Sequence, residues 1–353
     1  MNKILLALAI VTAAMVASCV KPYVAPDNKI KLKSAKFASD SLILTAGTVY
    51  QVDIKCDPDN FDINTLKWQS SDTTVVAVSS SGSVDAKKEG QATITVISPD
   101  NLISVSCKVF VVPPAPACNP TQLTGAATDI GIGADGSVFI TGTDSVSATG
   151  GFSIRKWNGS SFVVLPACAA VRVAAGPDGT PWVVNKSHLI FNNPGLNLIW
   201  NQLPGTATDI AVGADGSAYI IGTDSVSATG GYSIQKWNGN GWTVMPQCAG
   251  VRIAVDPHGT PWVVNKSHLI FRYPGNGVLW EQMPGAATDI GIGADGSVYI
   301  TGTDVASNTG GYSISKWNGY GWTKLSGVSG VNISVSPQGN PWWVDQSHLI
   351  FKN

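Results

Sequence analysis

Short runs of alternating apolar and polar residues, separated by glycine-rich turns, continue along the chain from about residue 119 to its end. In one such stretch Ile130 and Ile132 precede an Asp135–Gly136 turn, and the apolar run Val138–Ile140 follows it. Alternation with period two indicates β-strands with one buried face, and an Asp-Gly pair between two such runs favours a tight turn. The pattern therefore predicts an all-β fold built from hairpins.

The same stretch occurs three times at equal spacing, starting at Ala127, Ala207 and Ala287. A shorter motif, W-x-x-(L/M)-(P/S/T), divides each of these long repeats into two units. Its six occurrences start at Pro120, Phe162, Trp200, Trp242, Trp280 and Trp322. Units of roughly 40 residues that hold several short strands are typical of propeller blades, so residues 119–353 are predicted to form a six-bladed β-propeller.

The two ends of the repeat region complement each other. The last unit stops at Asn353, where its neighbours continue into a further strand. Segment Asn119–Thr124 matches that missing strand, with Pro120 at the position of Trp200. We expect this N-terminal segment to complete the last blade and to remove an open sheet edge.

A different pattern precedes the repeats. Residues 29–112 contain about seven short alternating runs, among them Gly90–Val96 and Ser104–Phe110, which predict a β-sandwich. Cys56 and Cys107 both fall on the inward side of their strands, and either a disulfide or two buried thiols fits the pattern. Residues 113–118 are proline-rich and predict a stiff linker.

The first residues resemble a bacterial lipoprotein signal. Lys3 precedes the apolar run Ile4–Val16, which is too short to span a membrane, and Val16–Cys19 resembles a lipobox. This resemblance predicts a signal peptide at 1–18, a lipid on Cys19 and a tether at 19–28. Val20 after the cysteine favours anchoring in the outer membrane and leaves open whether the protein faces the periplasm or the cell surface.

Composition excludes some functions. The formal net charge is −1, with 13% charged residues and no basic stripe, which argues against nucleic-acid binding. No C-x-x-C pair occurs, and the repeated histidines, His188, His268 and His348, occur only once in each long repeat. We therefore expect no metal and no cofactor, and we expect these histidines to make hydrogen bonds within or between blades.

Two family resemblances follow from these motifs. The W-x-x-(L/M)-P-G-x-A-x-D-I series, with a later P-W-V-V-N, resembles the tectonin repeat, which implies a six-bladed propeller lectin. The W-x-S-S-D and G-x-A-T-I-T-V motifs within residues 29–112 resemble the bacterial immunoglobulin-like domain of group 2, which implies a spacer. Together they suggest a lipid-anchored envelope protein that binds carbohydrate or lipopolysaccharide.

Candidate ligand residues recur once per long repeat. An aromatic ring can stack on a sugar, and a neighbouring amide and ammonium group can bind its hydroxyls. The predicted set is Trp182, Asn185, Lys186, Trp262, Asn265, Lys266, Trp342 and Asp345. The third copy differs, because Asp345 and Gln346 replace the Asn-Lys pair.

No catalytic constellation interrupts the repeats, so the protein is not expected to be an enzyme. Near-identical copies instead fit multivalent binding, in which weak sites act together on a repetitive surface. The alternative is a non-catalytic scaffold that docks a protein partner in an outer-membrane assembly, because propellers serve both roles.

Overall fold

The computed structural model describes residues 30–114, 117–275 and 279–353. The predicted signal segment, Cys19 and the tether lie outside these residues. The described chain consists of β-strands apart from one short 3₁₀ turn, Ile63–Thr65, so the predicted all-β class is confirmed. No helix in this part of the chain has the length and apolar character needed to cross a membrane.

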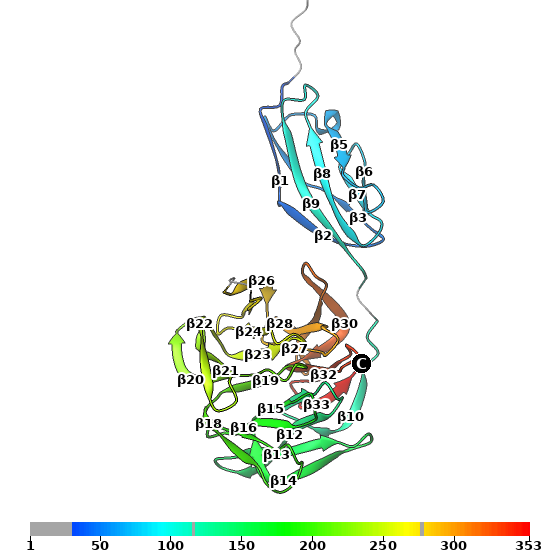
Figure 1. The fold of residues 1–353 in the computed structure, drawn as a ribbon. Helices are drawn as coiled ribbons and strands as arrows, with labels where there is room; N and C mark the ends of the chain where they lie inside the picture. The colour runs from blue at the N-terminus through cyan, green and yellow to red at the C-terminus, as the bar shows by residue number, and fades with distance from the viewer. Residues whose placement is uncertain (1–29, 115–116, 276–278) are drawn as a thin grey trace, which may run out of the picture.

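The N-terminal unit contains three packed sheets (Figure 1). The largest has the order β2 (Ser41–Thr45), β9 (Ser104–Val112), β8 (Gly90–Ile97) and β5 (Lys67–Ser70). The others pair β3 (Thr48–Gln51) with β7 (Ser83–Ala86) and β6 (Val76–Val78), and β1 (Ser34–Phe37) with β4 (Ile54–Asp57). Every second residue of β8 from Ala92 is buried, which is the alternation that the sequence predicts.

Cys56 and Cys107 are free thiols in this unit. Cys107 is buried and its Sγ donates to the Ser39 carbonyl at 3.4 Å, whereas Cys56 is only half-buried. Burial raises the pKa of both thiols. Of the two alternatives that the sequence left open, the structure contains the unpaired thiols.

Six four-stranded sheets follow within the described residues. We call three of them the odd sheets. In each odd sheet the second strand carries a long extension. These are β11 (Asp129–Ile132), β12 (Val138–Ser147), β13 (Gly151–Trp157) and β14 (Phe162–Ala170); β19 (Asp209–Val212), β20 (Ala218–Ser227), β21 (Gly231–Trp237) and β22 (Trp242–Gly250); and β27 (Asp289–Ile292), β28 (Val298–Ser307), β29 (Gly311–Trp317) and β30 (Trp322–Gly330).

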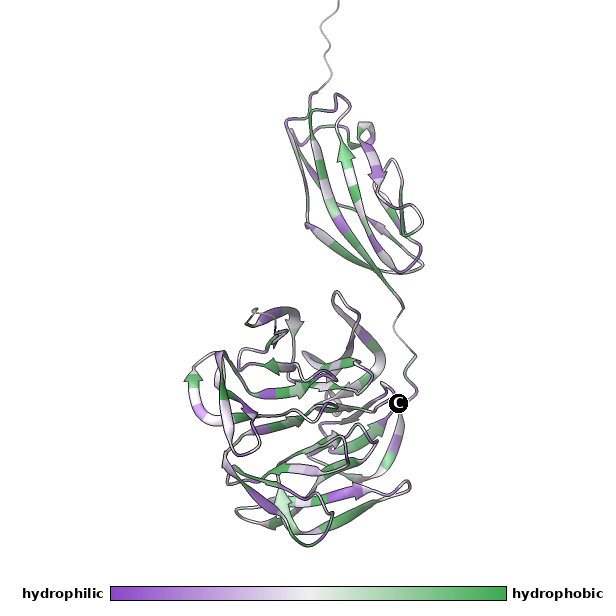
Figure 2. Ribbon diagram, in the orientation of Figure 1, coloured by the Kyte–Doolittle hydropathy of each residue, from purple (hydrophilic) through white to green (hydrophobic). Residues whose placement is uncertain are grey.

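The even sheets alternate with them along the chain and have shorter strands. They are β15 (Arg172–Ala175), β16 (Pro181–Val184), β17 (Leu189–Asn192) and β18 (Asn201–Thr206); β23 (Arg252–Val255), β24 (Pro261–Val264), β25 (Leu269–Arg272) and β26 (Glu281–Ala286); and β31 (Asn332–Val335), β32 (Pro341–Val344), β33 (Leu349–Lys352) and β10 (Thr121–Ala126). Apolar segments occur throughout these sheets (Figure 2), and those on the first and second strands are mostly buried.

The last even sheet is assembled from both ends of the repeat region. Strand β10 pairs antiparallel with β33, with Thr121 opposite Lys352 and Leu123 opposite Ile350. The Asn119 N–H also donates to Oδ1 of Asn353 at 2.8 Å. The sequence-based prediction that this N-terminal segment supplies the missing strand is confirmed.

The first strands of the six sheets contact one another in a closed circuit. Each of β11, β15, β19, β23 and β27 contacts the first strand of the next sheet, and β31 contacts β11. Their close approach explains a glycine on β11: a Cβ at Gly131 would lie 2.6 Å from the Val173 carbonyl oxygen. The inner strands are consequently buried on both faces.

Polar side chains, five of them charged, lie at the start of these inner strands in an alternating order. Going round the circuit they are Asp129, Arg172, Asp209, Arg252, Asp289 and Asn332. We call this set the inner ring. Each carboxylate also accepts the backbone N–H of a residue on the next sheet, from Val173, Ile253 and Ile333 at 2.8 to 3.0 Å.

The inner ring has one carboxylate more than it has cations. Arg172 lies 3.5 Å from Asp129 and 3.7 Å from Asp209, and Arg252 lies 3.4 Å from Asp289. At the place of a third arginine Asn332 contacts Asp129 at 3.4 Å. Burial, opposed by the arginines, raises the pKa of Asp129 to about 6 and that of Asp289 to about 7.

Removal of the closing strand should destabilise the repeat region. Deletion of residues 114–124 exposes the edge of β33 and removes the Leu123 side chain from its apolar cluster. We expect a lower melting temperature by calorimetry and aggregation by light scattering. A truncated protein that is as stable and monomeric as the parent would contradict this role of β10.

Restoring the third arginine should change how stability depends on pH. Carboxyls with folded pKa values near 6 and 7 hold protons that an unfolded chain, with an Asp pKa of about 4, releases. The stability that these bound protons contribute is therefore lost as the pH rises through the folded pKa values of about 6 and 7. Asn332→Arg should lower both pKa values and raise the melting temperature at pH 8 by roughly 5 °C, with little effect at pH 5. The uncharged control Asn332→Gln should not do so, and equal behaviour of the two variants would contradict the explanation.

Candidate functional site

Two equivalent cavities lie where an odd sheet meets the even sheet that follows it. Site 1, of about 670 Å³, lies between sheets β11–β14 and β15–β18, and site 2, of about 460 Å³, lies between β19–β22 and β23–β26. Their shared lining residues occupy equivalent positions of the first two long repeats. In the order site 1 then site 2, they are Val146 and Val226, Ser147 and Ser227, Thr149 and Thr229, Gly150 and Gly230, Cys168 and Cys248, Asn185 and Asn265, Phe191 and Phe271, and Trp200 and Trp280.

A bulge in the outer strand of the odd sheet forms one wall of each cavity. Opposite β13, residue Ser153 pairs with Ala169, but the adjacent Ile154 pairs with Leu165, so residues 166–168 are left out of the ladder. The same register shift occurs in β22. Pro166 and Pro246 suit this position because proline has no N–H to leave unpaired. The bulge separates the outer strand from the next sheet.

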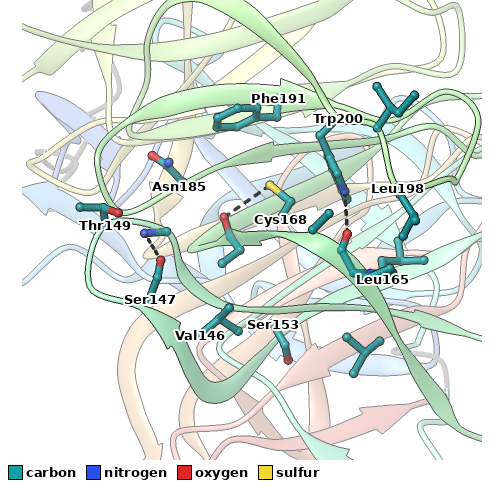
Figure 3. Close-up of a pocket in the computed structure, with 16 residues that line it drawn as sticks. Val146, Ser147, Thr149, Ser153, Leu165, Cys168, Asn185, Phe191, Leu198 and Trp200 are labelled. Atoms are coloured by element: carbon teal, nitrogen blue, oxygen red, sulfur yellow. Dashed lines mark hydrogen bonds between the residues drawn. The ribbon is translucent and has the colours of Figure 1, made fainter.

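An indole fixes each bulge to the next sheet. Nε1 of Trp200 donates to the Pro166 carbonyl at 3.0 Å, and Trp280 makes the same bond with Pro246 at 3.0 Å (Figure 3). Both indoles pack partly buried beside the phenylalanine of the even sheet, Phe191 or Phe271. Each site therefore has a rigid aromatic wall.

A buried amide lies at the inner end of each cavity. Asn185 and Asn265 are only 8% and 7% exposed. Their Oδ1 atoms accept the N–H of Leu189 and Leu269 at 2.8 Å and so close the turn after β16 or β24. In the described part of the chain Nδ2 of either residue has no hydrogen-bond partner, and both residues line their cavities. Each site thus presents an unpaired amide donor on a residue that is itself largely buried.

The long turn of the odd sheet completes the site. Ser147 Oγ accepts the N–H of Gly150 at 2.7 Å, and the Lys186 and Ser187 N–H groups donate to the carbonyls of Gly150 and Thr149. These bonds hold the turn of one sheet against the next and place two hydroxyl side chains, Ser147 and Thr149, near Asn185 (Figure 3). The Lys186 side chain is exposed and does not line the cavity.

Aliphatic side chains surround the opening of site 1. Leu198 and Ile199 are 68% and 70% exposed, and Val146 and Val164 are about half exposed. In the second repeat Val226, Val244 and Leu279 hold the matching exposed positions, of which Val226 lines site 2. The third repeat instead carries Lys324 at the position of Val164, where it pairs with Asp304 at 2.7 Å.

The corresponding place in the third repeat carries different side chains. Pro120 replaces the tryptophan, and Trp343 replaces Val183 and Val263. Trp343 is 2% exposed and stacks on Phe351 with ring centroids 5.6 Å apart. Leu325, also 2% exposed, packs in the same apolar cluster. The third repeat thus has a buried indole on β32 where the first two repeats have a valine, and it lacks the indole that forms the wall of sites 1 and 2.

The predicted tryptophans lie elsewhere, which corrects the sequence-based geometry. Trp182, Trp262 and Trp342 pack against Trp237, Trp317 and Trp157 of the following or first odd sheet, with centroids 6.2 to 6.4 Å apart. Trp262 and Trp342 are 4% and 8% exposed, and a cation lies over each ring, from Arg272 or Lys352. All three indoles pack between sheets, and Trp262 and Trp342 present no open face to a ligand, whereas Trp182 is partly buried.

Strand geometry explains this separation. Trp182 and Asn185 are three positions apart, and side chains at an odd spacing on an extended segment point to opposite faces of a sheet. The asparagine therefore faces the preceding odd sheet and the tryptophan faces the following one. Asp345 keeps the bond of its asparagine counterparts, because Oδ1 accepts the Leu349 N–H at 2.8 Å, but it offers no N–H donor.

The other repeated polar residues have structural partners. Nδ1 of His188, His268 and His348 lies 3.0 to 3.1 Å from the carbonyls of Ala207, Ala287 and Ala127. No group of three or more metal-ligating side chains occurs among the described residues. Burial raises the pKa of the Cys168 and Cys248 thiols to about 11, so both thiols are protonated at neutral pH.

The sequence-based prediction missed Trp200 and Trp280. A signal for them exists in the sequence, because both belong to the W-x-x-L/M-P motif. The equivalent position in the third copy, whose Asn-Lys pair is also altered, is Pro120. Joint loss of two features in one repeat indicates that they belong to one site.

Comparisons with known proteins agree with the order of the two units. Residues 31–109 match the family described as bacterial Ig-like domain (group 2), and residues 171–266 match the Tectonin domain. No curated protein matches the chain.

Several solved structures resemble the chain at low identity. YCF48 bound to a D1 peptide is 15% identical, covers 68% of this chain and 97% of its own, and superposes with a TM-score of 0.43. Regucalcin, a calcium-binding protein from Agrobacterium tumefaciens, is 13% identical, with coverage of 66% and 90% and a TM-score of 0.46. The WD40 β-propeller domain of Doa1 is 14% identical, with coverage of 66% and 94% and a TM-score of 0.43.

Proposed function

We propose that residues 119–353 form a six-bladed β-propeller that binds carbohydrate at sites 1 and 2. Six four-stranded sheets with a closed circuit of first strands support the blade count. The match of residues 171–266 to the Tectonin domain supports a lectin-like role. The repeated sites suit a binding protein rather than an enzyme.

The observation that carries this proposal is the pair of buried amides. Nδ2 of Asn185 and Asn265 faces a cavity lined by hydroxyl groups on one side and an aromatic wall on the other. A saccharide presents hydroxyl oxygens that accept from an amide and apolar C–H surfaces that pack on indole and phenyl rings. Asn185 and Asn265 thus offer equivalent amide donors in two equivalent cavities.

Two sites on one rigid body give the protein its avidity. A single exposed saccharide site binds weakly, but two sites on one body bind a dense glycan surface with a high effective concentration. The third repeat has Pro120 and Asp345 in place of the tryptophan and the asparagine, so the proposed number of sites is two. Lipopolysaccharide and other envelope glycans are repetitive enough to engage both sites.

The rest of the chain is proposed to hold the propeller at a membrane. In this view Cys19 carries a lipid in the outer membrane, and the Ig-like unit acts as a spacer, as its match to group 2 suggests. The stacking of Phe110 on Tyr320, with centroids 4.4 Å apart, supports a spacer that contacts the propeller.

A second candidate is a protein-docking role. The exposed Leu198 and Ile199 beside site 1 favour it, because adjacent exposed aliphatic side chains are common at protein interfaces. In that case the propeller would be a scaffold of an outer-membrane assembly and would bind no glycan.

Replacement of both asparagines by aspartate should abolish glycan binding without unfolding the protein. Asp345 shows that an aspartate can accept the N–H of the turn, so Asn185→Asp and Asn265→Asp keep that bond and replace the N–H donor with a carboxylate oxygen. We expect each single variant to weaken binding to a glycan array, and the double variant to reduce it at least a hundredfold.

The matched control is Lys186→Ala with Lys266→Ala, because these exposed side chains lie outside the cavities. It should bind like the parent. Normal binding by the double aspartate variant, with an unchanged melting temperature, would contradict these sites. Absence of any glycan ligand for the parent would favour the docking role.

Membrane attachment is tested at Cys19. Cys19→Ala should remove the thiol that carries the proposed lipid, so that metabolic labelling with a palmitate analogue is lost and the protein leaves the membrane fraction. Labelling that persists in this variant would rule out Cys19 as the lipidated residue.

A further inference from the structure

The bulge beside each site contains one residue in a left-handed backbone conformation. Ala167 has φ of 67° and Gln247 has φ of 66°, and the matching residue in the third repeat is Gly327, with φ of 73°. Glycine adopts this conformation freely, whereas a residue with a Cβ is strained in it. The first two repeats therefore keep a side chain where glycine would be more stable.

The strained residues coincide with the open cavities. Ala167 lines site 1 and Gln247 lines site 2, whereas Gly327 belongs to the repeat that has Pro120 and Asp345 in place of the tryptophan and the asparagine. Backbone strain of this kind is retained at functional positions. The third repeat, which lacks these two residues of the sites, carries the residue that relieves the strain.

The two side chains differ in chemistry, although most of the lining is shared. Ala167 adds a methyl group to the wall of site 1, next to the exposed Ile199 and Val164. Gln247 adds an amide, with two N–H donors and one acceptor oxygen, at the same place in site 2. The buried Asn185 and Asn265 donors are the same in both.

We propose that the left-handed residue of the bulge determines which saccharide each site accepts. Site 1 takes a sugar that places an apolar substituent against Ala167, such as a deoxy carbon or an acyl group. Site 2 takes a sugar that places a hydroxyl or amide against Gln247. This inference rests on the proposed carbohydrate binding and adds that the two sites differ in ligand preference.

The physical reason is the cost of covering a polar group without giving it a hydrogen-bond partner, because Ala167 and Gln247 are exposed until a ligand covers them. A Gln247 amide that faces an apolar substituent loses its water without gaining a partner, and a sugar hydroxyl that faces Ala167 does the same. Discrimination by a lost hydrogen bond is stronger than discrimination by a lost methyl contact. An exchange of residues at this position should therefore exchange the preferences.

The experiment isolates each site and exchanges the residue. Asn265→Asp leaves only site 1 active, and Asn185→Asp leaves only site 2 active. On each background the alanine or glutamine is exchanged, as Ala167→Gln or Gln247→Ala. The probe is an array of saccharide pairs that differ at one position, a hydroxyl in one member and a hydrogen or O-acetyl group in the other.

We expect Ala167→Gln to shift the preference of site 1 at least tenfold towards the hydroxyl member, and Gln247→Ala to shift site 2 as far in the opposite direction. Ala167→Gly and Gln247→Gly control for backbone strain: they should raise the melting temperature and give both sites the same preference.

Binding that persists with unchanged preferences after the exchange would overturn this inference and leave the proposed function intact. If the parent protein binds no glycan, both this inference and the proposed function are overturned. Exchange variants that lose binding while the glycine variants keep it would show that the side chain only fills space, which also contradicts a preference set by hydrogen bonding.

Discussion

The pairing of β10 with β33 is the constraint on which the repeat region depends. Each inner strand is buried because a neighbouring sheet covers it, so the sheets are stable only as a closed circuit. The circuit closes where the two ends of the repeat region share one sheet, at the contacts Thr121–Lys352 and Leu123–Ile350. The carboxylates of the inner ring depend on the same closure, because each accepts an N–H from the next sheet around the circuit.

Within this circuit the interfaces between sheets alternate between two kinds. From an even sheet to the following odd sheet, aromatic side chains such as Trp182, Trp237 and Trp242 fill the space. From an odd sheet to the following even sheet in the first two long repeats, the bulge in the outer strand lines a cavity. The long repeat, rather than either of its two shorter units, therefore contains both kinds of interface: one is packed with aromatic side chains and the other carries the proposed site.

Much of the fold was predictable from the sequence, and less of the site was. The repeat period, the all-β class and the closing strand follow from patterns that strands and turns impose locally, such as the Asp135–Gly136 turn. Asn185 was predicted because it recurs at a strand end, and it lines the cavity of site 1. Trp182 was placed wrongly beside it, because which face of a strand meets which neighbour is decided by the order of sheets around the circuit. The bulge at Pro166 was not predicted, since it depends on the register of β14 against β13.

The position of β10 also determines how the protein responds to mechanical tension. This strand follows the proline-rich linker directly, so under the proposed anchoring and ligand binding a pull between the two ends enters the fold at Asn119. The first bonds to bear the load are then the Asn119–Asn353 contact and the Thr121–Lys352 pair. The strand that closes the circuit would thus also be the first part of the repeat region to carry mechanical load.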